Sequence, residues 1–413
     1  MGKRLCMMFV LVLALMACGV SAQETKVDSG PIPAPAKQPA AQSGAASGAG
    51  YTGIQEIAVP KEYMVMPGMK VSGDGSLVLY IVQIAGDDLE YAAMANTTRL
   101  TNKSLEVAKD QREKTGDTNI SLDAADYRLT MIGDLEPSPL WQAVAYGAMT
   151  SRAGPVVLIN ALKAPDYASL YSVSGALPSW YAGTTGEMIA FFARKDNKIK
   201  LIADEEIALD DGALPVAAAI IRGKRKAYVV SMANRCSLYV DGKKVSEDYD
   251  AIEPAFFRKG TATDSTVAYI AKKGVESVLV VDGKVQTTDF VPAHDLVYAP
   301  GGDPYTYAAI KGGREFAVRN GARVTTDKDF AKVRWLTFDT TKTKLAYVAR
   351  DGSREWVMIN DRKVTPEYDL ITFCREQFRI NGTLIFAGLD AGKNSIVVGR
   401  LTEPAKADAS GQK

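Results

Sequence analysis

Histidine is almost absent from this chain, whose 413 residues include one, His294. A catalytic triad that uses histidine would have to be built around it, and no Gly-x-Ser-x-Gly nucleophile elbow accompanies it. A phosphate-binding loop, a His-Glu-x-x-His zinc motif and a dinucleotide-binding fingerprint are also missing from the sequence. His294 lies between predicted strands, in Pro292-Ala-His-Asp295, and is expected to be an ordinary loop residue. The sequence predicts no catalytic residue and no cofactor.

Metal-ligand spacings are missing as well. No cysteine pair has the spacing of a metal site. The acidic stretches Asp204-Glu205-Glu206 and Asp210-Asp211-Gly212 lack the alternating spacing of a calcium loop, so a solvated turn is favoured there. Cys236 and Cys374 lie in repeats that are not adjacent in sequence, and are predicted to be buried thiols rather than a disulfide.

A surplus of charge of one sign is the third absence. The chain has 49 basic and 48 acidic residues and a formal net charge of +1. A general nucleic-acid binder needs a basic surplus to neutralise phosphates. The composition therefore argues against a nucleic-acid partner.

Apolar runs long enough to suggest membrane contact occur only at the N-terminus, where residues 1–22 are predicted to be an export signal. Lys3 and Arg4 precede an uncharged apolar run, Leu5 to Ala17, that is too short to span a bilayer as a mature helix.

Two cleavage sites compete within this signal. Leu15-Met16-Ala17-Cys18 resembles the end of a bacterial lipoprotein signal covering residues 1–17, after which Cys18 would become the lipidated first residue. Val20-Ser21-Ala22 instead offers an ordinary site that would release a soluble periplasmic protein from Gln23. The lipoprotein interpretation is favoured because the cysteine directly follows the apolar run.

The segments that flank the predicted globular part are low in complexity. Residues 23–50 are rich in Pro, Ala, Gly and Ser, which cannot bury enough apolar surface to offset chain entropy, and should form a disordered tether. Residues 403–413 are expected to be a disordered tail. The folded domain is expected to cover residues 51–402.

Aromatic residues recur in this domain at intervals of about forty residues, the period of propeller blades. The successive spacings are 66, 45, 37, 41, 38, 40 and 39. A second marker, Asp or Asn, follows six of these aromatics after 13 or 14 positions. The aromatics are Tyr80, Tyr146, Phe191, Tyr228, Tyr269, Tyr307, Tyr347 and Phe386, and the markers are Asn160, Asp204, Asp241, Asp282, Asn320 and Asn360.

These repeats predict an all-β fold, a single β-propeller of four-stranded blades. The aromatic lies on an apolar second strand, which suits a sheet covered on both faces by its neighbours. In the clearest unit the strands are expected at residues 334–338, 344–349 and 355–359, with a short fourth strand around Tyr368–Ile371. Eight blades are favoured and seven are the alternative. The last unit supplies three strands from Gln377 onward, so a strand within Ile54 to Met66 is expected to close the ring.

The markers predict turns rather than ligands. Asp241-Gly242, Asp282-Gly283 and Asn320-Gly321 are pairs that tolerate the positive φ angles of a type I′ hairpin. Acidic–aromatic pairs follow the turns and are expected to fix the outermost strand. These pairs are Asp166-Tyr167, Tyr249-Asp250, Asp289-Phe290, Asp329-Phe330 and Tyr368-Asp369.

Residues 55–401 resemble bacterial propellers of the TolB and WD-repeat-like type, whose blades carry a Ser-Pro-Asp-Gly turn before an apolar second strand. Ser72-Gly73-Asp74-Gly75 approximates that turn, and Gly302-Asp303-Pro304 and Asp339 to Thr343 are more distant forms of it. The resemblance implies a propeller fold and protein–protein contact in the periplasm.

The interval from Tyr80 to Tyr146 holds a polar insertion near residues 95–120. Its segment Thr98 to Lys114 has helical charge pairing at Lys109–Glu113 but only a thin apolar stripe, so it is expected at the surface. A solvated loop and a recognition element are both compatible with it.

The turns between second and third strands carry many basic residues. Equivalent turns of a propeller emerge on one face, so they are expected to form a basic crown that attracts an anionic partner. The alternative is that these hairpins are simply polar. The candidates are Arg152, Arg194, Lys195, Lys198, Arg235, Lys272, Lys273, Lys311, Arg314, Arg350 and Arg354.

The function predicted from the sequence is a non-enzymatic interaction module of the bacterial cell envelope, lipid-anchored and facing the periplasm or the cell surface. Its loop faces would bind an envelope protein or an anionic polymer. Two alternatives stay open: a propeller hydrolase or lyase that uses carboxylates of the channel, and a binder of a small ligand or metal at the channel mouth.

Overall fold

The computed structural model describes most of the predicted domain, and each feature below belongs to that part of the chain. Cys18, the export signal, residues 23–49 of the tether, residues 101–128 of the insertion and the tail lie outside it. The described residues are 50–85, 90–100, 129–132, 135–138, 143–150, 154–161, 168–172, 178–183, 186–195, 198–203, 205–216, 219–222, 225–253, 256–257, 267–299, 304–324 and 328–402.

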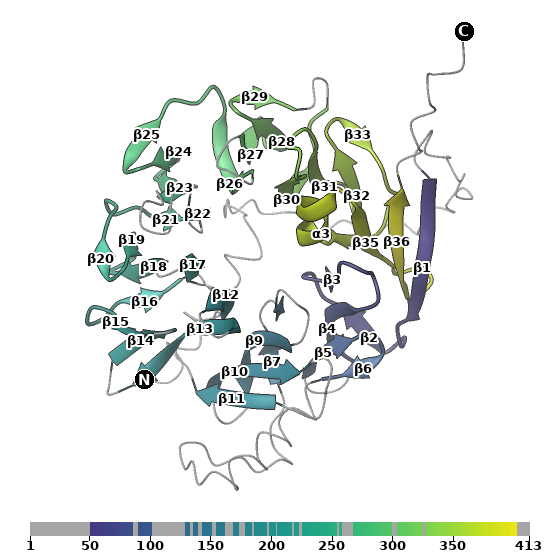
Figure 1. Ribbon diagram of the computed structural model, residues 1–413, viewed down its shortest axis with the longest axis horizontal. Helices are drawn as coiled ribbons and strands as arrows, with labels where there is room; N and C mark the ends of the chain where they lie inside the picture. Colours follow the sequence, from purple (N-terminus) through teal and green to yellow (C-terminus); the bar gives the residue numbers. More distant parts are fainter. Residues whose placement is uncertain are drawn as a thin grey trace, which may run out of the picture. The chain divides into compact units, whose positions relative to one another are not determined.

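Eight antiparallel sheets follow one another along this part of the chain, each a meander of four principal strands (Figure 1). They are numbered here as blades 1 to 8 in chain order. The eight-bladed propeller predicted from the repeat is confirmed, and the seven-bladed alternative is wrong. In blades 1, 2, 4 and 5 the first strand is split into two short pieces that both pair with the second strand.

The first four blades contain β2 to β20. Blade 1 has β2 (Tyr63–Val65), β3 (Lys70–Val71), β4 (Val78–Ile84), β5 (Glu90–Ala95) and β6 (Thr98–Arg99). Blade 2 has β7 (Leu129–Ile132), β8 (Glu136–Pro137), β9 (Ala143–Thr150), β10 (Gly154–Ala161) and β11 (Ala168–Ser172). Blade 3 has β12 (Ser179–Gly183), β13 (Gly186–Lys195), β14 (Lys198–Ile202) and β15 (Glu206–Ala208). Blade 4 has β16 (Leu214–Pro215), β17 (Ile220–Arg222), β18 (Arg225–Met232), β19 (Arg235–Val240) and β20 (Lys243–Lys244).

The remaining blades contain β21 to β36 and β1. Blade 5 has β21 (Ala251–Ile252), β22 (Phe256–Phe257), β23 (Val267–Lys273), β24 (Glu276–Val281) and β25 (Lys284–Gln286). Blade 6 has β26 (Val291–Tyr298), β27 (Tyr305–Lys311), β28 (Arg314–Arg319) and β29 (Ala322–Arg323). Blade 7 has β30 (Lys332–Phe338), β31 (Leu345–Asp351), β32 (Arg354–Ile359) and β33 (Arg362–Lys363). Blade 8 has β34 (Leu370–Phe373), helix α3 (Arg375–Asn381), β35 (Leu384–Asp390), β36 (Ser395–Thr402) and β1 (Gly50–Ala58).

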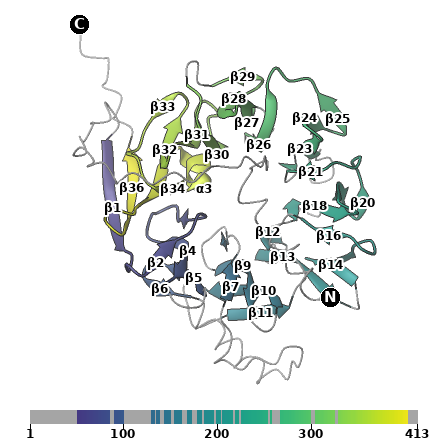
Figure 2. The same cartoon turned by 180° about the vertical axis from the view of Figure 1, so that it is seen from behind.

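The N-terminal strand β1 completes the last blade. It pairs antiparallel with β36, from Gly50 opposite Thr402 to Ala58 opposite Ser395, and the two strands lie side by side in both views (Figures 1 and 2). The predicted pairing of the first and last segments is therefore present. The strand begins at Gly50, earlier than the expected range, and so takes up the last residue assigned to the tether.

The eight repeated aromatics are all buried, as predicted. In blades 1 and 7 the hydroxyl of the repeated tyrosine contacts the turn that follows the third strand. Tyr347 donates to the carbonyl of Asn360 over 3.0 Å, and Tyr80 donates to that of Asn96 over 2.6 Å. Each of these turn asparagines has a positive φ, and its side-chain oxygen accepts the backbone N–H that begins the second strand. Four of the predicted markers are turn residues with a positive φ, Asp241, Asp282, Asn320 and Asn360. The prediction is wrong for Asn160, which lies within strand β10, and Asp204 lies outside the described residues. Asn96 was missed in the sequence because its hairpin is longer.

Apolar side chains fill the space between neighbouring blades. Among the described residues, clusters of buried side chains join blade 1 to 2, each successive pair from 3 to 8, and blade 8 to 1. Each cluster combines second and third strands of adjacent sheets, so these strands are apolar on both faces. Burial of this kind stabilises the folded state by roughly 25 cal/mol per Å² of apolar surface removed from water.

Three local expectations need correction. The segment around Tyr368 to Ile371 is not the fourth strand of blade 7, which is β33; it opens blade 8 with β34. Gln377 lies in helix α3 rather than in a strand. Thr98 and Arg99 of the expected insertion form the outermost strand of blade 1.

His294 also differs from expectation, because it lies inside strand β26 and not in a loop. The strand is bulged on both sides of this residue, and Asp295 adopts a φ of +57°. Cys236 and Cys374 are buried free thiols, as predicted. In the described part of the chain, no helix is both long and apolar enough to cross a membrane.

Candidate functional site

The predicted basic residues lie at the hairpins that join second and third strands, here called the rim hairpins. The pairs that close them are Lys195 and Lys198 in blade 3, Met232 and Arg235 in blade 4, Lys273 and Glu276 in blade 5, Lys311 and Arg314 in blade 6, and Asp351 and Arg354 in blade 7. Lys272 and Arg350 immediately precede the hairpins of blades 5 and 7. Arg152 lies outside the described residues.

The arginine that begins the third strand is tied down in blades 4 and 7. Arg354 donates to the carboxylate of Asp369 over 2.8 Å and to the backbone carbonyl of Glu367 over 2.6 Å. Arg235 makes the same two contacts, to the carboxylate of Asp250 and to the carbonyl of Asp248. The side chains of Arg235 and Arg354 are 40% and 38% exposed, yet their guanidinium groups are engaged within the protein.

The same aspartates reach the rim hairpin of the next blade. The Asp250 carboxylate accepts the backbone N–H of Gly274 over 2.5 Å, and that of Asp369 accepts the backbone N–H of Ala391 over 2.8 Å. In blade 6 the link is direct, since Arg314 donates to Asp351 of the blade 7 hairpin over 2.9 Å. The rim hairpins of blades 4 and 5, 6 and 7, and 7 and 8 are therefore connected by hydrogen bonds and ion pairs.

A repeated segment creates these links. The residues that lead from the outermost strand to the next blade, here called the return segment, read Lys244-Val-Ser-Glu-Asp-Tyr-Asp250 after blade 4 and Lys363-Val-Thr-Pro-Glu-Tyr-Asp369 after blade 7. The aromatic of each segment packs against the repeated aromatic of the next blade, with ring centroids 6.3 Å apart for Tyr249 and Tyr269 and 6.0 Å apart for Tyr368 and Phe386. The acidic–aromatic pair joins neighbouring blades, whereas it was expected to fix the outermost strand.

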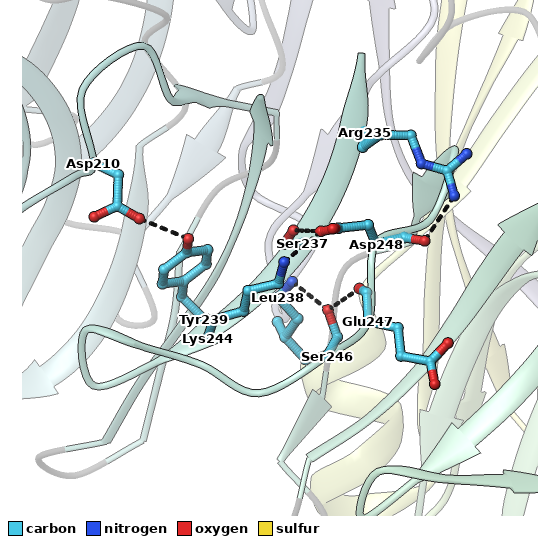
Figure 3. Close-up of polar contacts among 9 residues, drawn as sticks. All are labelled: Asp210, Arg235, Ser237, Leu238, Tyr239, Lys244, Ser246, Glu247 and Asp248. Atoms are coloured by element: carbon cyan, nitrogen blue, oxygen red, sulfur yellow. Dashed lines mark hydrogen bonds and ion pairs between the residues drawn. The ribbon is translucent and has the colours of Figure 1, made fainter. Parts of the chain in front are cut away.

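Figure 3 shows the side chains that converge on Asp248 in the return segment of blade 4. Ser237 Oγ and Lys244 Nζ donate to its carboxylate over 2.6 and 2.5 Å, and Arg235 Nη2 donates to its backbone carbonyl over 2.8 Å. The hydrogen bonds from Lys244 and Ser237 lower the pKa of Asp248. Lys363 and Glu367 form the corresponding pair in blade 7. Lys244 and Lys363 of the outermost strands are thus paired within their own blades.

A second tie joins adjacent blades beneath the rim. The residue that follows the rim arginine on the third strand contacts the first strand of the following blade. In blades 6 and 7 this residue is a buried glutamate. Glu315 accepts the backbone N–H of Val333 over 2.8 Å, and Glu355 accepts that of Ile371 over 2.9 Å. At the same position after blade 5, the first strand has Pro292, which has no N–H to donate. There Ser277 donates its hydroxyl to the carbonyl of Pro292 over 2.6 Å. A carboxylate acceptor therefore occurs opposite a backbone N–H, and a hydroxyl donor occurs opposite the proline carbonyl.

His294 and Arg334 occupy the first strands of blades 6 and 7 and pair with these glutamates. His294 Nε2 lies 3.1 Å from Glu315 Oε2, and Arg334 Nη2 lies 2.5 Å from Glu355 Oε2. Lys332 adds a second cation to Glu315, 2.9 Å from its Oε1. Burial alone would lower the pKa of His294, but its contacts with Asp295 and Glu315 outweigh it and raise the pKa to about 9. His294 is therefore charged at neutral pH.

Near His294, the pKa values of Asp295 and Glu315 are lowered, whereas that of Glu253 is raised. Burial raises the pKa of Asp295 and Glu315, but His294 and the other donors outweigh this, so both pKa values are lowered. Burial raises the pKa of Glu253, in the first strand region of blade 5. Among the described residues, no group of three or more His, Cys, Asp or Glu side chains is placed to hold a metal ion.

The rim hairpins of blades 5 and 6 are different, because they expose both lysine and apolar side chains. Lys273 and Lys311 are exposed, and Lys272 is partly exposed. Val275, at the tip of the blade 5 hairpin, has a relative accessibility of 101%. Ile310 in blade 6 is 39% exposed.

Comparisons with known proteins give similarity to β-propellers. No protein-family model and no curated protein matches the chain. The solved Dos1 propeller aligns with 85% of this chain and 94% of its own length, at 9% identity and a TM-score of 0.45. TolB from Acinetobacter baumannii aligns with 83% of this chain and 80% of its own, at 15% identity and a TM-score of 0.31.

An enzyme also contains a similar propeller. The acylaminoacyl peptidase of Pyrococcus horikoshii aligns with 75% of this chain, at 12% identity and a TM-score of 0.40. The alignment covers 54% of the peptidase, so this chain corresponds to about half of that protein. The propeller assignment of this chain rests on its own eight sheets and their order.

Proposed function

We propose that this chain is an exported, lipid-anchored β-propeller that serves as a non-enzymatic interaction module of the bacterial cell envelope. Its N-terminal residues support export, since a short charged start and an apolar run precede Cys18. Residues 23–49 have the composition of a flexible tether, with an r.m.s. reach of roughly 30 Å. This length would hold the propeller clear of the membrane to which Cys18 anchors it.

The observation that carries the interaction role is the connection between consecutive rim hairpins. Asp250 joins the hairpins of blades 4 and 5, and the Arg314–Asp351 pair joins those of blades 6 and 7. These contacts hold several hairpins together as a preorganised surface, which lowers the entropy cost of binding. Exposed Lys273 and Lys311 give part of that surface a positive charge that would attract an anionic envelope partner.

Affinity capture from the native host tests this function. The full-length protein should retain an envelope protein or an anionic envelope polymer, and raising the salt concentration should weaken the capture, because exposed charges are screened beyond about 8 Å at physiological ionic strength. Failure to retain any envelope component above the level of an untagged control would contradict the proposal.

The anchor has its own test. Cys18→Ala should abolish lipid modification, so the lipidated protein should disappear from the detergent extract of the membranes. What remains should be either the precursor or a product cut after Ala22. If the unmodified wild-type protein begins at Gln23 and is soluble, the anchor is wrong and the alternative of a soluble periplasmic module holds.

A propeller hydrolase or lyase is the second candidate, and Glu253 is the observation that favours it. Burial raises the pKa of this carboxyl group, as in general acids, and outweighs the nearby charges of Lys272 and His294, which lower it. Hydrolysis of a glycan or peptide panel that is lost in Glu253→Gln, in a folded protein, would support this candidate. An inactive wild-type protein would exclude it for that panel.

A further inference from the structure

Blade 5 lacks the arginine that links the rim hairpins of blades 4, 6 and 7 to residues near the following blade. Glu276 occupies the position held by Arg235, Arg314 and Arg354, as the pairing registers of the four hairpins show. The hairpin of blade 5 is instead linked to its neighbour through its backbone, at Gly274. In the described part of the chain, neither Lys272 nor Lys273 forms an ion pair within 4 Å, although Lys272 lies close enough to largely buried Glu253 to act on its pKa. Lys273 is exposed and Lys272 is partly exposed, so both side chains can be reached by a partner.

Exposed apolar side chains lie beside these lysines, on two adjacent blades. Val291 begins the first strand of blade 6, where it pairs directly with Ile310, and the two are 49% and 39% exposed. Ser277, which follows the blade 5 hairpin, donates its hydroxyl to the carbonyl of Pro292, the residue after Val291. The tip of the blade 5 hairpin, with fully exposed Val275, therefore flanks the same strand.

Six residues make up this surface, here called the blade 5–6 patch: Lys272, Lys273, Val275, Val291, Ile310 and Lys311. The exposed acid of the blade 5 and blade 6 hairpins is Glu276, which pairs across the hairpin with Lys273, while Glu253 near Lys272 is largely buried. The three lysines outnumber this exposed acid, so the patch keeps a positive charge. The guanidinium groups of Arg235 and Arg314 on either side are paired with Asp250 and Asp351. The net charge of the patch thus comes from its lysines.

We propose that the blade 5–6 patch docks an acidic protein segment that carries apolar side chains. The inference deepens the proposed function and rests on it. Charge complementarity requires the acidic groups, because three lysines stand against one glutamate. An anionic polysaccharide would use the lysines but leave the valines and isoleucine in water, whereas a protein segment covers both kinds of side chain. A membrane surface fits less well, since interfacial binding favours Trp, Phe and Leu, and the patch has none of these.

The opposite end of blade 5 supplies a matched control. The hairpin between its third and outermost strands carries Lys284 next to Val285, which is 59% exposed. Both hairpins therefore present an exposed valine beside a lysine, at opposite ends of strand β24. A partner drawn to any lysine–valine surface would contact both ends equally. A partner of the blade 5–6 patch would contact only the end that carries Val275.

Photo-crosslinking in the native host tests the proposal with the full-length protein. A photoreactive phenylalanine analogue replaces Val275 in one strain and Val285 in the other, and cross-linked peptides are identified by mass spectrometry. The expected result is a protein adduct from position 275, to a segment with net negative charge and apolar residues, and little adduct from position 285. Lys272→Glu, Lys273→Glu and Lys311→Glu together should reduce the adduct about tenfold through slower association.

Each other outcome overturns the inference. Equal adducts from both positions, an adduct to lipid or polysaccharide, or an adduct to a neutral or basic segment would each contradict a patch for acidic protein. If affinity capture retains an envelope partner but position 275 gives no adduct, the patch is wrong and the interaction module stands. If neither experiment finds a partner, the proposed function fails together with the patch.

Discussion

The rim hairpins of blades 4 and 5 lie next to each other and close with the same antiparallel pairing, but their charged side chains differ in their partners. In blade 4, Arg235 binds the carboxylate of Asp250 and the carbonyl of Asp248. In blade 5, Glu276 replaces the arginine, Lys273 is exposed, and partly exposed Lys272 acts on the pKa of largely buried Glu253; among the described residues neither lysine forms an ion pair within 4 Å. The comparison separates the rim arginines of blades 4, 6 and 7, which join blades, from the rim lysines of blades 5 and 6, for which the described residues show no ion pair. Lys198 of blade 3 belongs with the arginines, because its Nζ lies 3.8 Å from the carboxylate of Asp211.

The planar guanidinium explains the difference. It donates two hydrogen bonds in fixed directions, so Arg354 binds a carboxylate and a backbone carbonyl at once. A lysine ammonium is a flexible, strongly hydrated charge that fixes no such geometry. Of the residues expected to form a basic crown, Arg235, Arg314 and Arg354 have partners within the protein.

Removal of Glu355 should have the largest effect on the joined side of the comparison. This buried carboxylate accepts hydrogen bonds from Arg334 and from the backbone of Ile371 in blade 8. Glu355→Ala leaves the backbone N–H of Ile371 without its acceptor and leaves Arg334 with only the carbonyl of Ile371, and should lower the free energy of unfolding by about 3–5 kcal/mol. Glu276→Ala, at an exposed rim position, should change it by less than about 0.5 kcal/mol. Chemical denaturation of the two variants measures the difference, and equal losses would contradict the account.

His294 should give the joint beneath the rim a pH dependence. Its folded-state pKa of about 9 lies above its ordinary value of 6.5, so the stabilisation is complete below pH 6.5 and is lost as the pH rises through about 9. The loss should amount to about 3 kcal/mol. His294→Gln should be less stable than the wild type at pH 6 and should lack this decline. Parallel curves of stability against pH for the two proteins would show that the ion pair with Glu315 contributes nothing.

Loss of a rim arginine should have a smaller effect on stability. Arg354→Met removes an ion pair that is about one-third exposed and a hydrogen bond to the carbonyl of Glu367. We expect a loss of about 1 kcal/mol, because exposed ion pairs are weak. Lys363→Met, which removes the exposed pair with Glu367 within the same blade, should cost less. Thermal unfolding compares them, and a neutral Arg354→Met would place this arginine with the free charges.

Charge reversal of the free lysines should have the smallest effect on stability and a clear effect on binding. Lys272→Glu, Lys273→Glu and Lys311→Glu together should change the free energy of unfolding by less than about 0.5 kcal/mol per site. Association with an acidic partner should slow about tenfold, and the effect should diminish in high salt. Arg314 is left unchanged, because its reversal would also break the contact with Asp351. Surface plasmon resonance with the captured partner measures the rates.

Features whose cause is local were predictable from the sequence. The repeated aromatics and Asp-Gly or Asn-Gly turns lie within one hairpin, so their spacing revealed second strands, turns and eight blades. Tyr368 was assigned to the wrong blade, because the pattern around it is that of a strand and its packing partner, Phe386, belongs to the next sheet.

The pairing of the rim charges was not predictable in the same way. Arg235 and Asp250 are fifteen residues apart, and their contact depends on the path of the return segment between two blades. The repeat of Lys244–Asp250 as Lys363–Asp369 was the signal that could have revealed it. The place of His294 depends on a bulge in β26, whose position is set by pairing with β27 and not by its own residues.

Two matched triple variants test the separation of arginines and lysines most directly. One has Arg235, Arg314 and Arg354 replaced by Gln, and the other has Lys272, Lys273 and Lys311 replaced by Gln, so each removes three positive charges. The measurement is the amount of envelope partner captured by each folded protein from the native host at low salt. The account predicts that the lysine variant loses most of the partner and that the arginine variant keeps it. Equal retention by both variants, or loss confined to the arginine variant, would contradict it.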